Sequence, residues 1–577
     1  MRFIVSVGLF FLAAVLITLG MFFRTIWGEQ ETMTKTIAVP NSQDFTLVDL
    51  DSLRSIAKTV EFNISDSTAS GSTATSSNIF LVWGRKPDVL AWMGDVSHTV
   101  ITGDPKTGEL ASKSVSGLAD FSNRDFNSDL WIQYFQGQGA LNKEISTLPD
   151  CYALIASDGW SPAPANVEVT WKYDVDYTVS NRLFFFGILM GVAGLILFIL
   201  GWWEDNRKHR HRQGRMPMRP RQRRWKPPRG PLAPRRRKGR RALGFISVFG
   251  VSAVLLSGCV SPSSTTPTPI PSPTESDDGT YVSVVPEQFD RIYRRLIGVL
   301  DTADNSLLAS DASERLAGAA FRFRSAEYTV KKTDKSLVDL FNIPDGNVRL
   351  LLPQQTDTWP RSVFAIIDNK LDPKAPSIAV VMTQESALEN YKLVYYMGLE
   401  PGVKIPPVAT PAKGTTVLPS DTQVLMLTPT QAAVEYGDVL QNGENSEYAF
   451  QIAPDSLQEQ VGANAKAKRT KQLEGTAKFE WKQSLTEDAP LVFATLDAGA
   501  IVAITLQESE IVRPAGQGAA ISATGAVKAL AGRDASLIGL EADYQYQLLL
   551  YVPSIGSASQ IRLLGYSYAL VAAKEIQ

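Results

Sequence analysis

Two apolar stretches that flank a strongly basic segment constrain this chain more than any other feature of its sequence. Residues 183–203 run for 21 positions without a charge, enough for a helix to cross a hydrocarbon layer of about 30 Å. Residues 207–241 contain 17 lysines and arginines and no acidic residue, and a second apolar stretch, residues 242–260, follows directly. Because Lys and Arg collect in cytoplasmic loops, this pattern predicts a membrane protein whose basic segment, residues 205–241, is cytoplasmic.

The N-terminus supplies a further apolar span at residues 3–23, with Arg2 before it and Arg24 after it. A cleaved signal peptide is one interpretation. We favour an uncleaved anchor over residues 1–27, because the span is long and no A-x-A cleavage site follows it. With the N-terminus inside, residues 28–180 are expected outside the membrane. A second transmembrane helix over residues 181–204 then returns the chain to the cytoplasm.

Residues 242–260 end in a pattern that resembles a bacterial lipobox, Leu256, Ser257, Gly258 and Cys259. A basic run precedes it, and a linker rich in Ser, Thr and Pro, residues 261–279, follows it. Two interpretations stay open. Either this is a lipoprotein-type signal, cut before a lipidated Cys259, or it is a third transmembrane helix. Both place the rest of the chain outside, in a multi-pass protein of the cell membrane with two large extracytoplasmic regions.

Composition excludes several classes of site. The basic segment could contact phosphate, but Trp225 is its only aromatic residue, so it lacks a base-stacking platform. We therefore expect contact with anionic membrane lipid and no nucleic-acid partner. The chain has two cysteines and three histidines, and His209 and His211 lie in the basic segment. No disulfide scaffold, metal site or cofactor is expected.

Residues 28–180 are predicted to form an all-β extracytoplasmic sandwich of antiparallel strands. The expected strands are short, rich in Val, Ile, Thr and aromatic residues, and separated by turn-forming residues. They cover residues 34–39, 59–64, 79–84, 130–135, 152–157 and 167–173. Cys151 is expected to be a buried small residue. The S-x-x-K of residues 55–58 and the K-T-G of residues 106–108 lack a third acyl-enzyme motif between them, so they do not indicate such an enzyme.

The C-terminal half contains an apparent internal repeat. Residues 363–368 (VFAIID) resemble residues 492–497 (VFATLD), and residues 383–386 (TQES) resemble residues 506–509 (LQES). Residues 391–396 and 546–551 give a weaker third match in the same order. We predict two copies of one α+β domain, residues 280–425 and residues 426–577. Glu385 and Glu508 occupy matched positions of the two copies.

Each copy is predicted to begin with helices and to continue as a sheet. The expected helices cover residues 287–304, 313–328 and 455–473. The expected strands cover residues 362–368, 378–384, 391–399, 478–483, 491–496, 501–507, 544–552 and 560–572. Helices on one face of a curved antiparallel sheet are similar to the cystatin/NTF2-like architecture, which often encloses a ligand pocket. The aromatic residues predicted to line such a pocket are Phe321, Tyr391, Tyr395, Trp481, Tyr544 and Tyr546.

Several stretches carry a family resemblance. They are the first 20 residues, VWGR at residues 82–85, DVLAWMGD at residues 88–95 and LIASDG at residues 154–159. With the layout of the second span and the repeat, they resemble an uncharacterised family of actinobacterial multi-span membrane proteins with a lipoprotein-like C-terminal half. Members are sometimes labelled glycosyltransferases. The resemblance carries no catalytic residues to this chain. The D-x-D triplets at residues 49–51 and 174–176 match a pattern of many glycosyltransferases, but no nucleotide-binding α/β unit surrounds either one.

Three functions fit these features. The favoured one is a non-enzymatic cell-envelope protein that presents extracytoplasmic domains to a cell-wall polymer, a lipid or an envelope protein. The second is an accessory subunit of a membrane complex, recruited through its spans. The third is an extracytoplasmic enzyme acting on envelope glycans or lipids through carboxylates, which requires two acids to converge in one pocket.

Overall fold

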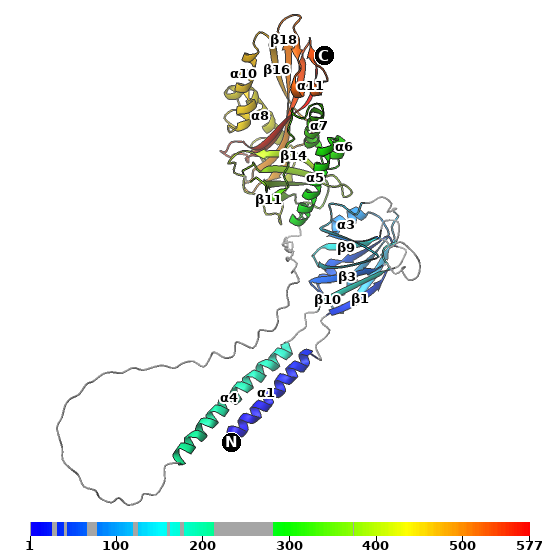
Figure 1. Ribbon diagram of the computed structural model, residues 1–577, viewed down its shortest axis with the longest axis vertical. Coiled ribbons are helices and arrows are strands. Elements are labelled where there is room, and N and C mark those ends of the chain that lie inside the picture. Colours follow the sequence, from blue (N-terminus) through cyan, green and yellow to red (C-terminus); the bar gives the residue numbers. More distant parts are fainter. Residues whose placement is uncertain are drawn as a thin grey trace, which may run out of the picture. The chain divides into compact units, whose positions relative to one another are not determined.

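The computed structural model describes residues 2–25, 32–39, 43–65, 78–118, 125–157, 162–172, 178–212, 281–372 and 374–576. The chain divides into two compact units, one of Met1–Glu31 with Tyr173–Pro271 and one of Thr32–Lys172 with Ser272–Gln577 (Figure 1). The lipobox residues Leu256, Ser257, Gly258 and Cys259 lie outside the described residues. So do the third apolar stretch, most of the basic segment and the linker after it.

The first unit contains two long apolar helices, α1 (Arg2–Thr25) and α4 (Thr178–Arg212), which run side by side in opposite directions (Figure 1). Both are long and apolar enough to cross a membrane, over Phe3–Arg24 and Thr178–Glu204. Their contact depends on small residues. A Cβ at Gly187 would lie 2.7 Å from the Cγ1 of Ile17, and the hydroxyl of Ser180 donates a hydrogen bond to the carbonyl of Gly20. Small residues at such contacts let two helix backbones approach closely.

The N-terminal β domain, defined here as residues 32–172, consists of two stacked sheets. One sheet has the strand order β1-β10-β3-β8 and the other β6-β5-β2-β9-β4-β7. One apolar core contains side chains of both sheets, such as Phe62 and Trp171 from the first and Leu81 and Ile155 from the second. The strands are β1 (Thr32–Ala38), β2 (Phe45–Asp49), β3 (Thr59–Ser65), β4 (Asn78–Arg85), β5 (His98–Gly103), β6 (Leu110–Val115), β7 (Gln133–Gln138), β8 (Ala140–Ser146), β9 (Cys151–Ala156) and β10 (Asn166–Lys172).

This domain is a β-sandwich, but it is neither purely antiparallel nor purely β. Strands β2 and β5 pair in parallel, and the chain forms two short helices, α2 (Leu50–Arg54) and α3 (Lys86–Met93). Helix α3 covers the outer face of the larger sheet through Val89, Trp92 and Met93. The strand predicted at residues 130–135 is displaced, because β7 begins only at Gln133.

The C-terminal region, residues 281–576, is built on one continuous ten-stranded sheet. Its order is β11-β12-β13-β14-β22-β21-β18-β17-β15, with β16 paired to β18. The strands are β11 (Gly346–Pro353), β12 (Arg361–Asn369), β13 (Ile378–Gln384), β14 (Lys392–Leu399), β15 (Val417–Leu418), β16 (Ala477–Leu485), β17 (Leu491–Ala494), β18 (Ala500–Pro514), β21 (Leu540–Val552) and β22 (Arg562–Glu575); β19 (Ile521–Ser522) and β20 (Ala535–Ser536) form a separate ribbon. The predicted copies therefore share one sheet, and the boundary at residue 425 does not separate two sheets.

The sheet has two halves, a first half of β11–β14 and a second half of β15–β18, β21 and β22, and the seam where they pair is short. Strands β14 and β22 pair only through Gly398 with Tyr566 and Leu399 with Gly565. A Cβ at Gly565 would lie 2.6 Å from the carbonyl oxygen of Gly398, so glycine is needed for the strands to meet. Away from the seam the sheet folds onto itself. Phe364 of one half and Phe493 of the other share one core, with their ring centroids 5.8 Å apart.

Helices cover the outer face of each half (Figure 1). Helices α5 (Pro286–Ser306) and α7 (Gly318–Thr333) pack on the first half, joined by the short α6 (Ala309–Ala312). Helix α8 (Pro429–Asn442) packs on the second half, followed by the 3₁₀ turn η2 (Gly443–Asn445) and by α9 (Ser456–Val461), α10 (Ala463–Gln472) and α11 (Gly525–Ala531). The helix predicted over residues 455–473 is two helices that meet at Gly462, and α8 was not predicted.

Candidate functional site

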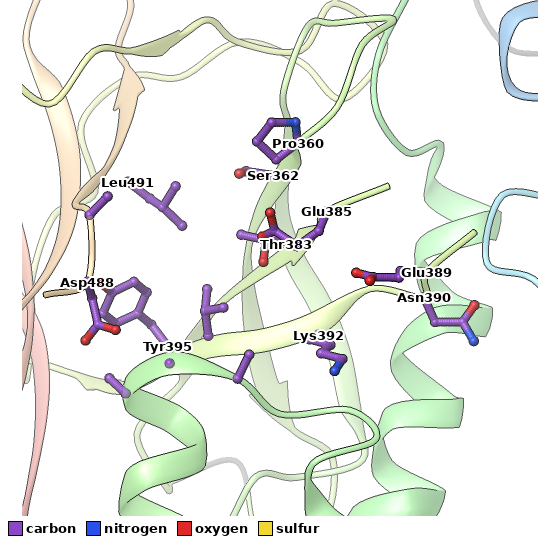
Figure 2. A pocket seen from close by; sticks show the side chains of 15 residues that line it. Pro360, Ser362, Thr383, Glu385, Glu389, Asn390, Lys392, Tyr395, Asp488 and Leu491 are labelled. Atoms are coloured by element: carbon purple, nitrogen blue, oxygen red, sulfur yellow. The ribbon is translucent and has the colours of Figure 1, made fainter. Parts of the chain in front are cut away.

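A cavity of about 400 Å³ opens where the two halves of the C-terminal region meet. Both apolar side chains, such as Val394 and Leu491, and polar side chains line it. Figure 2 shows Glu385, Glu389 and Lys392 on one side of the cavity and Asp488 beside Tyr395 on the other. The lining residues are Ala317, Gly318, Ala319, Pro360, Ser362, Thr383, Glu385, Glu389, Asn390, Lys392, Val394, Tyr395, Asp488, Ala489 and Leu491.

The first turn of α7 forms one wall, and Asp488 from the other half lies against it. Gly318 has a φ of +55°, and a Cβ there would lie 3.5 Å from Oδ1 of Asp488. Arg322, one turn further along α7, forms a salt bridge with Asp488, and Thr486 donates a hydrogen bond to the same carboxylate at 2.9 Å. Burial raises the pKa of Asp488, but these hydrogen bonds outweigh it and hold the pKa below its usual value. Asp488 is therefore an ionised structural group.

The opposite wall is the loop between β13 and β14. Gln384 donates a hydrogen bond to the carbonyl of Glu389 at 2.7 Å, and Trp359 donates one to Gln384 at 3.1 Å. The Glu385 and Glu389 side chains are exposed at the rim. Asn390 accepts a hydrogen bond from the backbone N–H of Asp129 at 2.9 Å. The N-terminal β domain thus contacts the loop that bounds the cavity.

Asp129 is the central residue of that contact. Its carboxylate is fully buried and forms salt bridges with Arg315 and, at 3.2 Å, with Arg295. The backbone N–H of Tyr391 donates to the same carboxylate at 3.0 Å. A buried carboxylate is stable only when it is paired in this way. Asp129 therefore joins the N-terminal β domain to α5, to the segment before α7 and to the cavity loop.

A second buried ion pair joins the same two parts of the chain. Asp88, at the start of α3, lies 2.7 Å from Arg85 of its own domain and 2.7 Å from Arg361 of β12. Arg361 is fully buried, and its guanidinium stacks 3.8 Å from the ring centroid of Trp359. No sequence pattern indicated these pairs, because their partners are far apart in the sequence. Asp88 and Arg361 are 273 positions apart, and Asp129 and Arg315 are 186 positions apart.

The six aromatic residues predicted to line a pocket do not line one cavity. Only Tyr395 lines the cavity. Tyr391 is fully buried below the rim, where its hydroxyl donates to the carbonyl of Ser283 at 3.3 Å. Phe321 packs against the core beneath α5 and α7. Trp481, Tyr544 and Tyr546 lie in the second half, on β16 and β21.

These last three residues lie beside two buried acids of β18. Glu508 forms a salt bridge with Lys466 of α10, and Tyr546 donates a hydrogen bond to it at 3.3 Å. Glu510 pairs with Arg469 at 2.6 Å. Burial raises the pKa of Glu510, and Arg469 opposes that shift. Glu508 is thus buried, whereas its predicted repeat counterpart Glu385 is exposed at the cavity rim.

Cys151 is buried at the start of β9. Burial raises the pKa of Cys151 to about 12, so the thiol stays protonated at neutral pH and is a poor nucleophile. Among the parts of the chain that the structure describes, no group of three or more His, Cys, Asp or Glu side chains could hold a metal ion.

Comparison with known proteins gives one match. Residues 304–575 are similar to a family described as a domain of unknown function, DUF8094. That match runs from the end of α5 to the end of β22 and therefore treats both predicted copies as one domain. No curated protein and no solved structure matches the chain.

Proposed function

We propose that this protein is a non-enzymatic, membrane-anchored envelope protein whose cavity binds a short segment of a cell-wall polymer. The cavity at the seam of the C-terminal region is the observation that carries the proposal. Its volume of about 400 Å³ and its apolar lining residues suit a small ligand or a single unit of a polymer. At the rim, Glu385 and Glu389 supply acceptors, Lys392 supplies donors and Asn390 supplies an amide. This set suits hydroxyl and amino groups of a glycan or a stem peptide.

Binding fits the cavity better than catalysis does. Asp488 is held by Arg322 and Thr486, so it is not poised as a proton donor. Ser362 and Thr383 supply hydroxyls, but the set of lining residues contains no histidine and so no imidazole base for them. The buried acids Glu508 and Glu510 are neutralised by Lys466 and Arg469. Three acids, Glu385, Glu389 and Asp488, do line one cavity, as the carboxylate-dependent enzyme requires. Glu385 and Glu389 are exposed and Asp488 is paired with Arg322, so the contacts favour the binding protein.

The proposed topology has both large regions outside the cell. The salt bridges of Asp129 and Asp88 require the N-terminal β domain and the C-terminal region to lie on one side of the membrane. If α1 and α4 both cross it, the chain must cross again between α4 and α5. Residues 242–260 are the apolar stretch available for that crossing, as a third helix or as a lipoprotein-type signal at Cys259.

The test is co-sedimentation of the full chain, in mild detergent, with purified insoluble cell-wall material. We expect the wild type to sediment, and Lys392→Ala and Glu389→Gln each to weaken binding about tenfold. That loss corresponds to about one charged hydrogen bond. Matched controls are Lys374→Ala and Glu474→Gln, which change exposed residues outside the cavity. Equal losses in variants and controls, or no sedimentation of the wild type, would refute the assignment.

A further inference from the structure

The contact between the N-terminal β domain and the C-terminal region resembles a permanent interface more than a transient one. Asp129 is fully buried, and Arg315 is almost so. Asp88 and Arg361 are likewise buried. In each pair the acid comes from the N-terminal β domain and the arginine from the C-terminal region. Desolvated charge pairs of this kind can couple two protein surfaces strongly, as measured in tight complexes.

Hydrogen bonds to backbone carbonyls and apolar contacts surround the two ion pairs. Two side chains of α5 donate hydrogen bonds to backbone carbonyls of the N-terminal β domain. Gln288 donates to the carbonyl of Asp129 at 2.7 Å, and Arg291 donates to the carbonyl of Ile132 at 2.8 Å. In the other direction, Arg85 donates to the carbonyl of Ser283 at 3.2 Å. Trp359 and Ala387 of the C-terminal region belong to the same apolar cluster as α3. An apolar centre with paired charges and hydrogen bonds is the anatomy of a specific interface.

We propose that the N-terminal β domain is a docking surface for the C-terminal region, and that the two stay bound when the chain between them is cut. The occupant is thus a segment of this same chain, residues 281–576, held through Asp129 and Asp88. The proposal does not depend on what the cavity binds. It has a consequence at the lipobox-like sequence. A cut before Cys259 would leave a complex attached to the membrane at two points, not a free lipoprotein.

The test uses the full chain in mild detergent, with a protease recognition sequence inserted into the linker of residues 261–279 and an affinity tag at the N-terminus. After complete cleavage, the tagged fragment is captured, and the complex is diluted stepwise through gel filtration. We expect the C-terminal fragment to be retained at nanomolar dilution and in 1 M salt, because buried ion pairs are screened little. Separate elution of the two wild-type fragments at micromolar concentration would overturn the proposal.

A substitution identifies the surface responsible. Asp129→Asn keeps the side-chain shape but removes the charge that faces Arg315 and Arg295. We expect it to weaken retention at least about 30-fold, the low end for loss of one partner of a buried pair. Asp104→Asn is the matched control, because Asp104 is exposed on the β5–β6 turn and caps only the N–H of Lys106.

Folding of the variants is checked before cleavage by near-ultraviolet circular dichroism. If Asp129→Asn does not fold, Arg295→Ala replaces it, since Arg295 is partly exposed and its loss is milder. A folded variant that is retained as well as the wild type would show that this contact does not hold the fragments together. Wall binding is measured separately, so failure of the cavity assignment and failure of the docking proposal remain distinguishable.

Discussion

Replacing Arg361 tests how much the buried ion pairs stabilise the second unit. The guanidinium lies 2.7 Å from Asp88, donates to the carbonyl of Asp357 at 2.9 Å and stacks on Trp359. Arg361→Ala removes these contacts, together with the hydrogen bond to the carbonyl of Thr358 at 3.2 Å, and leaves Asp88 buried. Breaking a buried pair costs about 3–5 kcal/mol. Because Asp88 keeps Arg85 at 2.7 Å, we expect the low end, about 3 kcal/mol, plus about 1 kcal/mol for the lost stacking.

Thermal unfolding followed by tryptophan fluorescence measures this loss. An unfolding entropy of about 2.1 cal/mol/K per residue, spread over Thr32–Lys172 and Ser272–Gln577, converts it into a fall in Tm of about 4 °C. Arg361→Lys should recover only part of it, because an ammonium group cannot reproduce the planar fork. A double-mutant cycle with Asp88→Asn should give a coupling free energy of about 2 kcal/mol. A fall below 1 °C, or strictly additive effects, would refute the reasoning.

Three further predictions follow from other contacts. Lys466→Met should destabilise the C-terminal region by about 3 kcal/mol in urea unfolding, because Glu508 stays buried without its cation; Lys468→Met, at an exposed position of the same helix, should change it by less than about 0.5 kcal/mol. The pKa of Glu510 is raised above 4.5 in the folded state, so above pH 4.5 the folded state binds more protons than the unfolded state. Stability therefore falls as the pH rises through the folded pKa. Glu510→Gln should make the dependence of Tm on pH less steep in that window, and an unchanged slope would contradict this. Gly187→Leu should lower the amount of full-length protein in membranes by forcing α1 and α4 apart, whereas Gly8→Leu, where nothing lies within 4 Å of an added Cβ, should not.

Local patterns predicted much of the secondary structure. The two long apolar helices α1 and α4 could be predicted because residues 3–23 and 183–203 are long and carry no charge. The helix predicted at residues 287–304 agrees closely with α5 because its apolar residues recur at helical spacing. Helix α8 was missed, although Thr428, Pro429 and Gln431 form a readable start signal, a capping box with Pro at the first position. Strand β2 was missed because it is buried on both faces and shows no alternation.

Local sequence patterns could not predict the cavity or the buried ion pairs beside it. Only Tyr395 among the predicted aromatic residues lines the cavity, because the cavity arises where two halves of one sheet meet. The short seam at Gly398 and Gly565 is a tertiary pairing with no sequence period. Asp129 sits in a turn before β7, one position before the strand predicted at residues 130–135, and its arginines are more than 160 positions away. Acids that pair over such separations look like ordinary surface charges in the sequence.

The central claim is that the N-terminal β domain and the C-terminal region both lie outside the cell. Its most direct test is cysteine labelling in intact cells with a membrane-impermeant maleimide. Glu144→Cys reports on the N-terminal β domain and Leu371→Cys, at a position 95% exposed, on the C-terminal region, each in a Cys259→Ser background. Native Cys151 contributes little signal, because its thiol is buried and its pKa is raised to about 12. The account predicts that both positions label before lysis. Labelling of one position before lysis and of the other only afterwards would contradict it. The two regions would then lie on opposite sides of the membrane and could not form the ion pairs of Asp129 with Arg315 and of Asp88 with Arg361.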